Sequence, residues 1–304
     1  MSEARVNKLR YVAVAVPDFA SEHEFIKSTW GLKETEFVGD TAYYSAEASS
    51  EPYVYRLRKA DEKRLDLISF GAKDAQAVDA LAKRVADSGA QLVTQPQSLN
   101  GPGGGYGFRF FDPDGRTVEI SSDVVEREAR ELERGESIPA SLSHVVLHAT
   151  DVKTTVAFYE QQLGFRVSDW LGDAFCFLRC NEWHHSIAFL PGPPCLNHVA
   201  FAMRDLNEVM RGISRLVKSN ISLAWGPGRH TAGDNVFAYF VAPSGFILEY
   251  TAEVEKIDEA TWTPTFYERS PNISDQWGTG LLLGDFERMG RPAPDPGLFK
   301  APPR

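Results

Sequence analysis

Short apolar stretches typical of β-strands recur along the chain, and four of them lead to an aspartate that precedes a helical pattern. Each aspartate lies seven residues after the same position of its strand, and the four are Asp18, Asp74, Asp151 and Asp205. A side-chain oxygen in that place can cap the first turn of a helix. Apolar residues then recur at helical spacing, as in Val156, Phe158, Tyr159 and Leu163. Strand-rich sequence follows each helix, so the pattern predicts four modules of the βαβββ type.

The four modules form two pairs, because the two halves of the chain end alike. Residues 111–120 read Phe-Asp-Pro-Asp-Gly-Arg-Thr-Val-Glu-Ile, and residues 241–250, which begin 130 positions later, read Val-Ala-Pro-Ser-Gly-Phe-Ile-Leu-Glu-Tyr. Both place Pro and Gly where a tight reversal between strands needs them. We therefore expect an α+β fold with mixed or antiparallel sheet. We expect domains at residues 1–136 and 137–304, joined by a charged and partly helical linker over residues 126–140.

The second of these hairpins carries a carboxylate on an otherwise apolar strand. Residues 235–241 and 246–250 are predicted as its strands, and Glu249 is the charged residue of the latter. A buried carboxylate is costly unless a cation or hydrogen-bond donors meet it. A metal ion would serve, and so would a neighbouring Arg229.

Comparison of the two halves supplies an internal control for candidate metal ligands. The equivalent positions are His144 and Tyr11, His198 and Leu67, Glu249 and Glu119, and Tyr239 and Arg109. Two imidazoles and one carboxylate from three strands match the facial arrangement whose open positions suit non-haem Fe(II) and oxygen chemistry. Each residue alone could be an ordinary hydrogen-bonded strand residue. As a set that the first half lacks, His144, His198 and Glu249 predict a metal site.

Three further residues are candidates for catalysis beside that metal. His230 and Tyr239 could deprotonate and orient a phenolic substrate, and His185 or its neighbour His184 could face the same site. Adjacent residues of a strand point to opposite faces, so only one of the two neighbours is expected to look inward, and the pattern does not choose between them. His148 shares a face with His144 and is expected to be structural or at the edge of the pocket.

Composition narrows the class of protein. The chain has 304 residues, 43% of them hydrophobic, and a formal net charge of −10, which argues against nucleic acid or an anionic membrane as the main partner. Three cysteines without a Cys-x-x-Cys pair suit a reducing compartment. No apolar run approaches the roughly 20 residues that span a bilayer, and we expect a cytoplasmic protein. The Pro-rich end of the chain predicts no helix or strand.

These residues resemble the type I extradiol ring-cleavage dioxygenases of the vicinal oxygen chelate superfamily, such as catechol 2,3-dioxygenases and 2,3-dihydroxybiphenyl dioxygenases. The resemblance spans nearly the whole chain, and Tyr239 lies nine residues after His230 and ten before Glu249, as in that family. The motifs that carry it are Leu142-Ser143-His144, Asn181-Glu182-Trp183-His184-His185-Ser186, Leu196-Asn197-His198-Val199-Ala200-Phe201, Gly228-Arg229-His230-Thr231 and Leu248-Glu249-Tyr250.

The resemblance implies two open mixed β-barrels, the first of them a vestigial domain without a metal. It implies Fe(II), or Mn(II) in some members, at His144, His198 and Glu249. His185 would be the acid–base catalyst, and His230 and Tyr239 would orient the catecholate. The expected reaction is insertion of both atoms of O2 into a catechol-type diol, giving a muconic semialdehyde-type product of aromatic catabolism. Family members are commonly homo-oligomers, which we expect here too.

Other functions of the same fold remain open at this point. They are a metal-dependent isomerase or lyase of the glyoxalase type, a metal-free protein that binds small molecules, and a dioxygenase that acts on a hydroquinone or trihydroxybenzene ring. The sequence also departs from some relatives at Val146, Ala232 and Gly233, so it does not name the ring.

Overall fold

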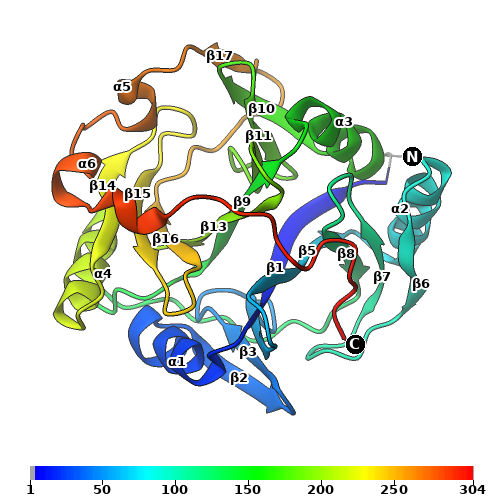
Figure 1. Cartoon of the computed structure of the whole chain (residues 1–304). Helices are drawn as coiled ribbons and strands as arrows, with labels where there is room; N and C mark the ends of the chain where they lie inside the picture. The colour runs from blue at the N-terminus through cyan, green and yellow to red at the C-terminus, as the bar shows by residue number, and fades with distance from the viewer. Residues whose placement is uncertain (1–3, 304) are drawn as a thin grey trace.

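The computed structural model describes residues 4–303 and contains two mixed β-sheets with helices packed on them (Figure 1). The first sheet has eight strands in the order β2-β3-β4-β1-β5-β8-β7-β6. The strands are β1 Val6–Val16, β2 Lys33–Val38, β3 Thr41–Ser45, β4 Tyr55–Lys59, β5 Arg64–Ala72, β6 Leu92–Ser98, β7 Tyr106–Phe111 and β8 Thr117–Ser122. The helices of this half are α1 Phe19–Glu24, which continues into the π-helix η1 Phe25–Trp30, and α2 Ala75–Asp87.

The second sheet has nine strands in the order β14-β15-β16-β13-β9-β12-β11-β10-β17. The strands are β9 Ser141–Ala149, β10 Arg166–Leu171, β11 Phe175–Arg179, β12 Ile187–Pro191, β13 Cys195–Ala202, β14 Leu223–Arg229, β15 Val236–Val241, β16 Ile247–Ala252 and β17 Thr265–Tyr267. The helices are α3 Val152–Leu163, α4 Leu206–Lys218, α5 Pro271–Ser274, α6 Gly280–Leu283 and the 3-10 turn η2 Phe286–Met289. None of the helices within residues 4–303 is long and apolar enough to cross a bilayer.

The strand pairing repeats between the halves. Strand β1 runs parallel to β4 and antiparallel to β5, and β5 runs parallel to β8. In the second half β9 pairs with β12 and β13, and β13 with β16, in the same senses. The predicted α+β fold of paired modules with mixed sheets is therefore confirmed.

The four predicted helix caps are also confirmed. The carboxylates accept a hydrogen bond from the backbone N–H three residues on, at 2.9–3.1 Å, and the pairs are Asp18 with Ser21, Asp74 with Ala77, Asp151 with Thr154 and Asp205 with Glu208. The two hairpin turns repeat as well. Gly115 and Gly245 adopt φ of +85° and +78°, which glycine tolerates without strain, and each N–H bonds back to the residue three before it.

One continuous apolar core runs through both halves. Trp30, at the end of η1, is fully buried and stacks on Tyr250 of β16 with ring centroids 4.0 Å apart. The Tyr250 hydroxyl donates to the Trp30 carbonyl at 2.5 Å. The first module of the chain therefore packs on the fourth, which couples the first half to the strand that carries Glu249.

The expected helix in the linker is wrong. Residues 126–140 contain neither helix nor strand. The N–H groups of Arg127 and Arg130 bond to the carbonyls of Ser50 and Glu47 at 2.8 and 3.0 Å. Because these donors have partners on another loop, the segment does not need the helical hydrogen bonds that its composition would allow.

The C-terminal segment spans both sheets (Figure 1, orange to red). Strand β17 adds in parallel to β10, and near the end of the chain the Asp295 carboxylate accepts the N–H of Leu65 at 2.6 Å. The Phe299 ring lies against Phe111 of β7. Residues 291–303 form no helix or strand, as their proline content predicts.

Candidate metal centre

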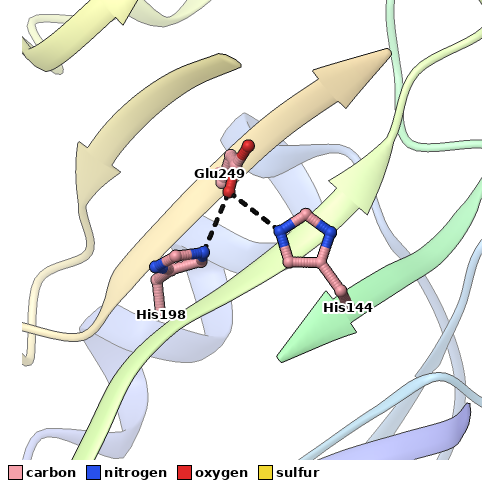
Figure 2. Close-up of side chains that lie close together, drawn as sticks. All are labelled: His144, His198 and Glu249. Carbon is pink, nitrogen blue, oxygen red and sulfur yellow. Dashed lines mark ion pairs between the residues drawn. The ribbon is translucent and has the colours of Figure 1, made fainter. Parts of the chain in front are cut away.

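Three adjacent strands bring His144, His198 and Glu249 together (Figure 2). Ala200 of β13 pairs with His144 of β9 on one side and with Glu249 of β16 on the other. The Glu249 Oε2 atom lies 3.3 Å from Nε2 of His144 and 3.0 Å from Nε2 of His198. One ligand atom from each of the three side chains lies within 4.8 Å of the other two. The spacing is that of donor atoms arranged around one ion.

The buried polar atoms of this cluster lack partners of their own. Glu249 is fully buried, and neither of its oxygens has a hydrogen-bond partner among residues 4–303; the same holds for Nε2 of His198. The equivalent Glu119 of the first half accepts hydrogen bonds from Tyr11, Ser69 and Arg109 at 2.8–3.0 Å. Buried polar groups are normally satisfied. The contrast between the two glutamates indicates that a cation completes the second site.

Neighbouring residues leave the Nε2 atoms of both histidines free for a metal. Nδ1–H of His198 donates to Asn197 Oδ1 at 2.6 Å, and the Asn197 amide donates to Nε2 of His148 at 2.9 Å. Nδ1 of His144 meets the Ser143 hydroxyl at 3.0 Å. Such partners hold the ring and its tautomer. His148, expected to be structural or at the pocket edge, takes part in this chain and donates Nδ1–H to the Pro191 carbonyl.

The electrostatics around Glu249 keep its carboxylate ready to coordinate a cation. Burial alone would raise the pKa of Glu249, but the His144 and His198 imidazoles reverse the shift and hold that pKa below its usual range. Burial lowers the pKa of His198, and the Glu249 charge offsets only part of the effect. At neutral pH the carboxylate is therefore ionised. Arg229, the alternative partner for Glu249, instead pairs with Glu253 and Asp234.

His185 lies against His144, with ring centroids 4.1 Å apart. The expectation that His184 and His185 lie on a strand is wrong, because they precede β12 in a loop and both are buried. Nδ1 of His184 lies 3.0 Å from Nδ1 of His185, and its Nε2 lies 2.8 Å from the Asp169 carboxylate. One assignment of protons satisfies every contact: His184 donates to Asp169 and accepts Nδ1–H of His185. Nε2 of His185 then keeps its lone pair.

His230 and Tyr239 form a second pair beside the cluster. The His230 Nδ1–H donates to the Ser274 carbonyl at 2.6 Å, so Nε2 can accept the Tyr239 hydroxyl at 3.1 Å. The Tyr239 and His198 rings meet edge to face with centroids 5.0 Å apart. Burial lowers the pKa of His230 to about 4 and, with the Glu249 charge, raises the pKa of Tyr239 well above 10. Burial and the other histidines lower the pKa of His185 well below 6.5. All three groups are neutral at pH 7.

The structure adds residues that the sequence pattern did not reveal. Asp169 from β10, Asn197 and the Ser274 carbonyl from α5 each hold a candidate side chain. The apolar cluster beside them contains Val146, Phe177, Ala188 and Ala232. Asn197 directly precedes a candidate ligand in the sequence and could have been singled out, whereas Asp169 and Ser274 lie 15 and 44 positions from their partners.

Comparisons with known proteins agree with this geometry. The sequence model of the Glyoxalase/Bleomycin resistance protein/Dioxygenase superfamily matches residues 141–250. A Mn(II)-bound glyoxalase from Novosphingobium aromaticivorans is similar at 47% identity and a TM-score of 0.95, covering 97% of this chain and 98% of that one. Metapyrocatechase 2 of Cupriavidus necator is 29% identical over 294 residues, 90% of this chain and 89% of its own. An iron-dependent extradiol dioxygenase of Rhodococcus jostii is 27% identical over 202 residues, 58% of this chain and 64% of its own.

Proposed function

We propose that this chain, which belongs to the Glyoxalase/Bleomycin resistance protein/Dioxygenase superfamily, is an extradiol dioxygenase. It would open a catechol-type ring with O2. The names of two relatives support this activity: metapyrocatechase and iron-dependent extradiol dioxygenase. The metal is Fe(II), with Mn(II) as the alternative that the name of the 47% identical protein suggests.

The observation that carries the proposal is the fully buried Glu249, whose oxygens lack hydrogen-bond partners among residues 4–303 and lie beside two imidazoles, with three more acid–base groups around it. His144, His198 and Glu249 would hold the ion. The carboxylate and a divalent ion leave the site with one positive charge, which suits a diol bound as a monoanion. Bound iron supplies coordination positions for the diol oxygens and O2, and a route for electrons between them.

The chain's own residues would bind the diol and handle its protons. Tyr239 keeps its proton because its pKa is raised, so it is a hydrogen-bond donor to a diol oxygen. Nε2 of His230 accepts a proton that the diol releases, and the Ser274 carbonyl holds the ring in place for this. His185 is the acid–base catalyst, with its tautomer held by His184 and Asp169. The apolar residues near His185 exclude water from the reacting ring.

We further infer that residues 137–304 form the catalytic domain and residues 1–136 a domain without a metal site. The cluster that could hold an ion within residues 4–303 lies in the second half. We also propose that the protein acts as a homo-oligomer in the cytoplasm, with a small aromatic diol and O2 as its substrates. The net charge of −10 supports the absence of nucleic acid and membrane partners.

The second candidate function is that of a metal-dependent isomerase or lyase of the glyoxalase type, which the name of the 47% identical structure favours. Such an enzyme uses the metal without consuming O2. Oxygen consumption therefore separates the two.

The test begins with anaerobic loading of Fe(II) or Mn(II), followed by O2 uptake with one- and two-ring catechols, hydroquinones and trihydroxybenzenes. We expect stoichiometric uptake, a yellow product, and loss of both metal and activity in His198→Ala. The matched control is Tyr11→Phe at the position equivalent to His144, which should keep both. Bound metal without uptake on any diol would move the assignment to the glyoxalase type, and full metal and activity in His198→Ala would refute the ligand set.

A further inference from the structure

The first half retains a pocket where the second half has its metal centre. The cavity measures about 290 Å³ and is lined by Tyr11, Arg109 and Glu119, which correspond to His144, Tyr239 and Glu249. The strand register supports this correspondence: Ser69 pairs with Glu119 as Ala200 pairs with Glu249. The first half therefore has a cavity at the place equivalent to the metal centre, without the two histidines.

In this pocket an arginine takes the place of a metal ion. The Arg109 guanidinium donates to Glu119 at 2.8 Å, and the hydroxyls of Tyr11 and Ser69 donate to its other oxygen at 2.9 and 3.0 Å. Glu119 is thus neutralised and fully satisfied by the protein. No divalent ion is needed there, and any ligand must be recognised by other groups.

Arg56 is a charged residue of the pocket that has hydrogen-bond donors without partners among residues 4–303. It lines the cavity, its residue is 5% exposed, and its Nε and Nη2 atoms have no hydrogen-bond partner among residues 4–303. Its nearest carboxylate is Asp66, 3.7 Å away. Asp66 is already held by Arg58 at 2.8 and 2.9 Å and by Arg64 at 3.0 Å. A buried guanidinium that shares one carboxylate with two closer arginines is a site for an anion.

The other charged groups of the pocket are paired or exposed. Arg10 pairs with Glu51 at 3.1 Å, and Lys8 pairs with the same carboxylate at 2.6 Å. Glu36 lines the cavity and is exposed. These carboxylates would repel a dianion such as phosphate more than a monoanion. The pocket is thus suited to a single negative charge placed at Arg56.

The aromatic side chains that line the pocket suit a planar ligand. Tyr53 packs on Tyr11 with ring centroids 4.4 Å apart and meets Tyr43 edge to face at 4.9 Å. The three tyrosines form one small buried cluster with Ala13 and Leu67. In the second half Tyr43 and Arg56 correspond to Phe177 and Ala188, because each pair is joined by the same strand register. The first half therefore carries a phenol and a guanidinium where the second half has apolar side chains.

We propose that this pocket is a metal-independent binding site for a flat monocarboxylate the size of a benzoate. The Nε and Nη2 atoms of Arg56 have almost no accessible surface, so the guanidinium would turn toward the cavity and bind the carboxylate through two parallel hydrogen bonds, a geometry that its planar fork favours. The tyrosine rings would pack on the conjugated body. The site is separate from the metal centre and does not depend on the activity proposed above.

The test uses the full-length, metal-free protein and two fluorinated probes of equal size. 4-Fluorobenzoate carries the charge and 4-fluorobenzamide does not, and binding is measured by fluorine NMR titration. We expect saturable binding of the benzoate, about 10- to 100-fold weaker binding in Arg56→Met, and weak binding of the amide. His198→Ala is the control for the metal centre and should bind the benzoate like wild type.

Three outcomes would overturn the proposal. They are benzoate affinity unchanged in Arg56→Met, equal affinity for the amide, or loss of benzoate binding in His198→Ala, which would place the ligand at the metal centre. Where Arg56→Met does not fold, Arg56→Lys decides. It keeps the charge but loses the planar fork, so binding should weaken several-fold, and an unchanged affinity would contradict the recognition mode.

Discussion

Replacing Asp169 by Asn tests whether the protein sets the protonation of His185 from a distance. Asp169 is 1% exposed and accepts two hydrogen bonds, one at each oxygen: Thr265 N–H at 2.7 Å and His184 Nε2–H at 2.8 Å. The substitution keeps the size of the side chain and removes its charge. Asn has a single acceptor oxygen, so it cannot satisfy both donors.

The consequence is a change of tautomer. If the Asn oxygen keeps the Thr265 N–H, its amino group faces His184 and must donate to Nε2. His184 then carries its proton on Nδ1 and donates to Nδ1 of His185 across the 3.0 Å contact. The proton of His185 moves to Nε2, so this atom loses the lone pair with which it would act as a base.

The expected loss follows from the energy of the contact that is broken. A hydrogen bond to a charged group contributes about 1.5–3 kcal/mol, and each 1.36 kcal/mol of barrier is about tenfold in rate. We therefore expect kcat to fall about 10- to 100-fold, with metal content unchanged. The assay is O2 uptake on the Fe(II)-loaded enzyme, with iron measured on the same sample.

The matched control is Asp295→Asn, which alters a half-buried carboxylate that likewise accepts backbone N–H groups, at Leu65 and Gly297. It touches no histidine and should leave kcat as in wild type. Unchanged kcat in Asp169→Asn would refute control of the tautomer by this contact. Loss of iron in step with activity would show instead that Asp169 acts through the fold of the site.

Three further predictions concern other members of the site. Glu249→Gln should abolish metal retention, because it removes the charge that a divalent ion needs while keeping the size of the side chain; metal analysis of the purified variant measures this, and full metal content would contradict it. Tyr239→Phe should lower kcat about tenfold with full metal content, since it removes only the hydroxyl that we propose donates to a diol oxygen; kinetics equal to wild type would exclude this role. Burial lowers the pKa of His230 to about 4, below its unfolded value, so the unfolded state binds more protons between these values and stability falls as pH drops. Metal-free wild type should therefore lose about 2 kcal/mol more than His230→Gln between pH 7 and pH 5, as urea unfolding at both values would show; equal losses would mean that His230 is not the group responsible.

The parts of this molecule that the sequence predicts are those that depend on local spacing or on the internal duplication. The caps at Asp74 and Asp205 need only a side chain and an N–H three residues on. The duplication then transfers register from one half to the other, so the sequence places His144 and His198 on equivalent strands before their distance is known. The sequence pattern does not predict conformations that are set by hydrogen bonds to residues distant along the chain. Examples are the contact of His184 with Asp169 and the linker at residues 126–140.

The two glutamates show why partners that are remote along the chain matter for function. Glu119 and Glu249 occupy equivalent positions of strands β8 and β16 and are both buried. The hydropathy pattern therefore does not distinguish between them. One is met by Arg109 and two hydroxyls, and the other by atoms that carry lone pairs. A buried carboxylate must be compensated in either case, and the means of compensation separates a site that binds metal from one that does not. Arg109 satisfies Glu119 without filling the cavity, so the first half keeps a pocket lined by Arg56, the guanidinium that we propose as the site for a carboxylate ligand.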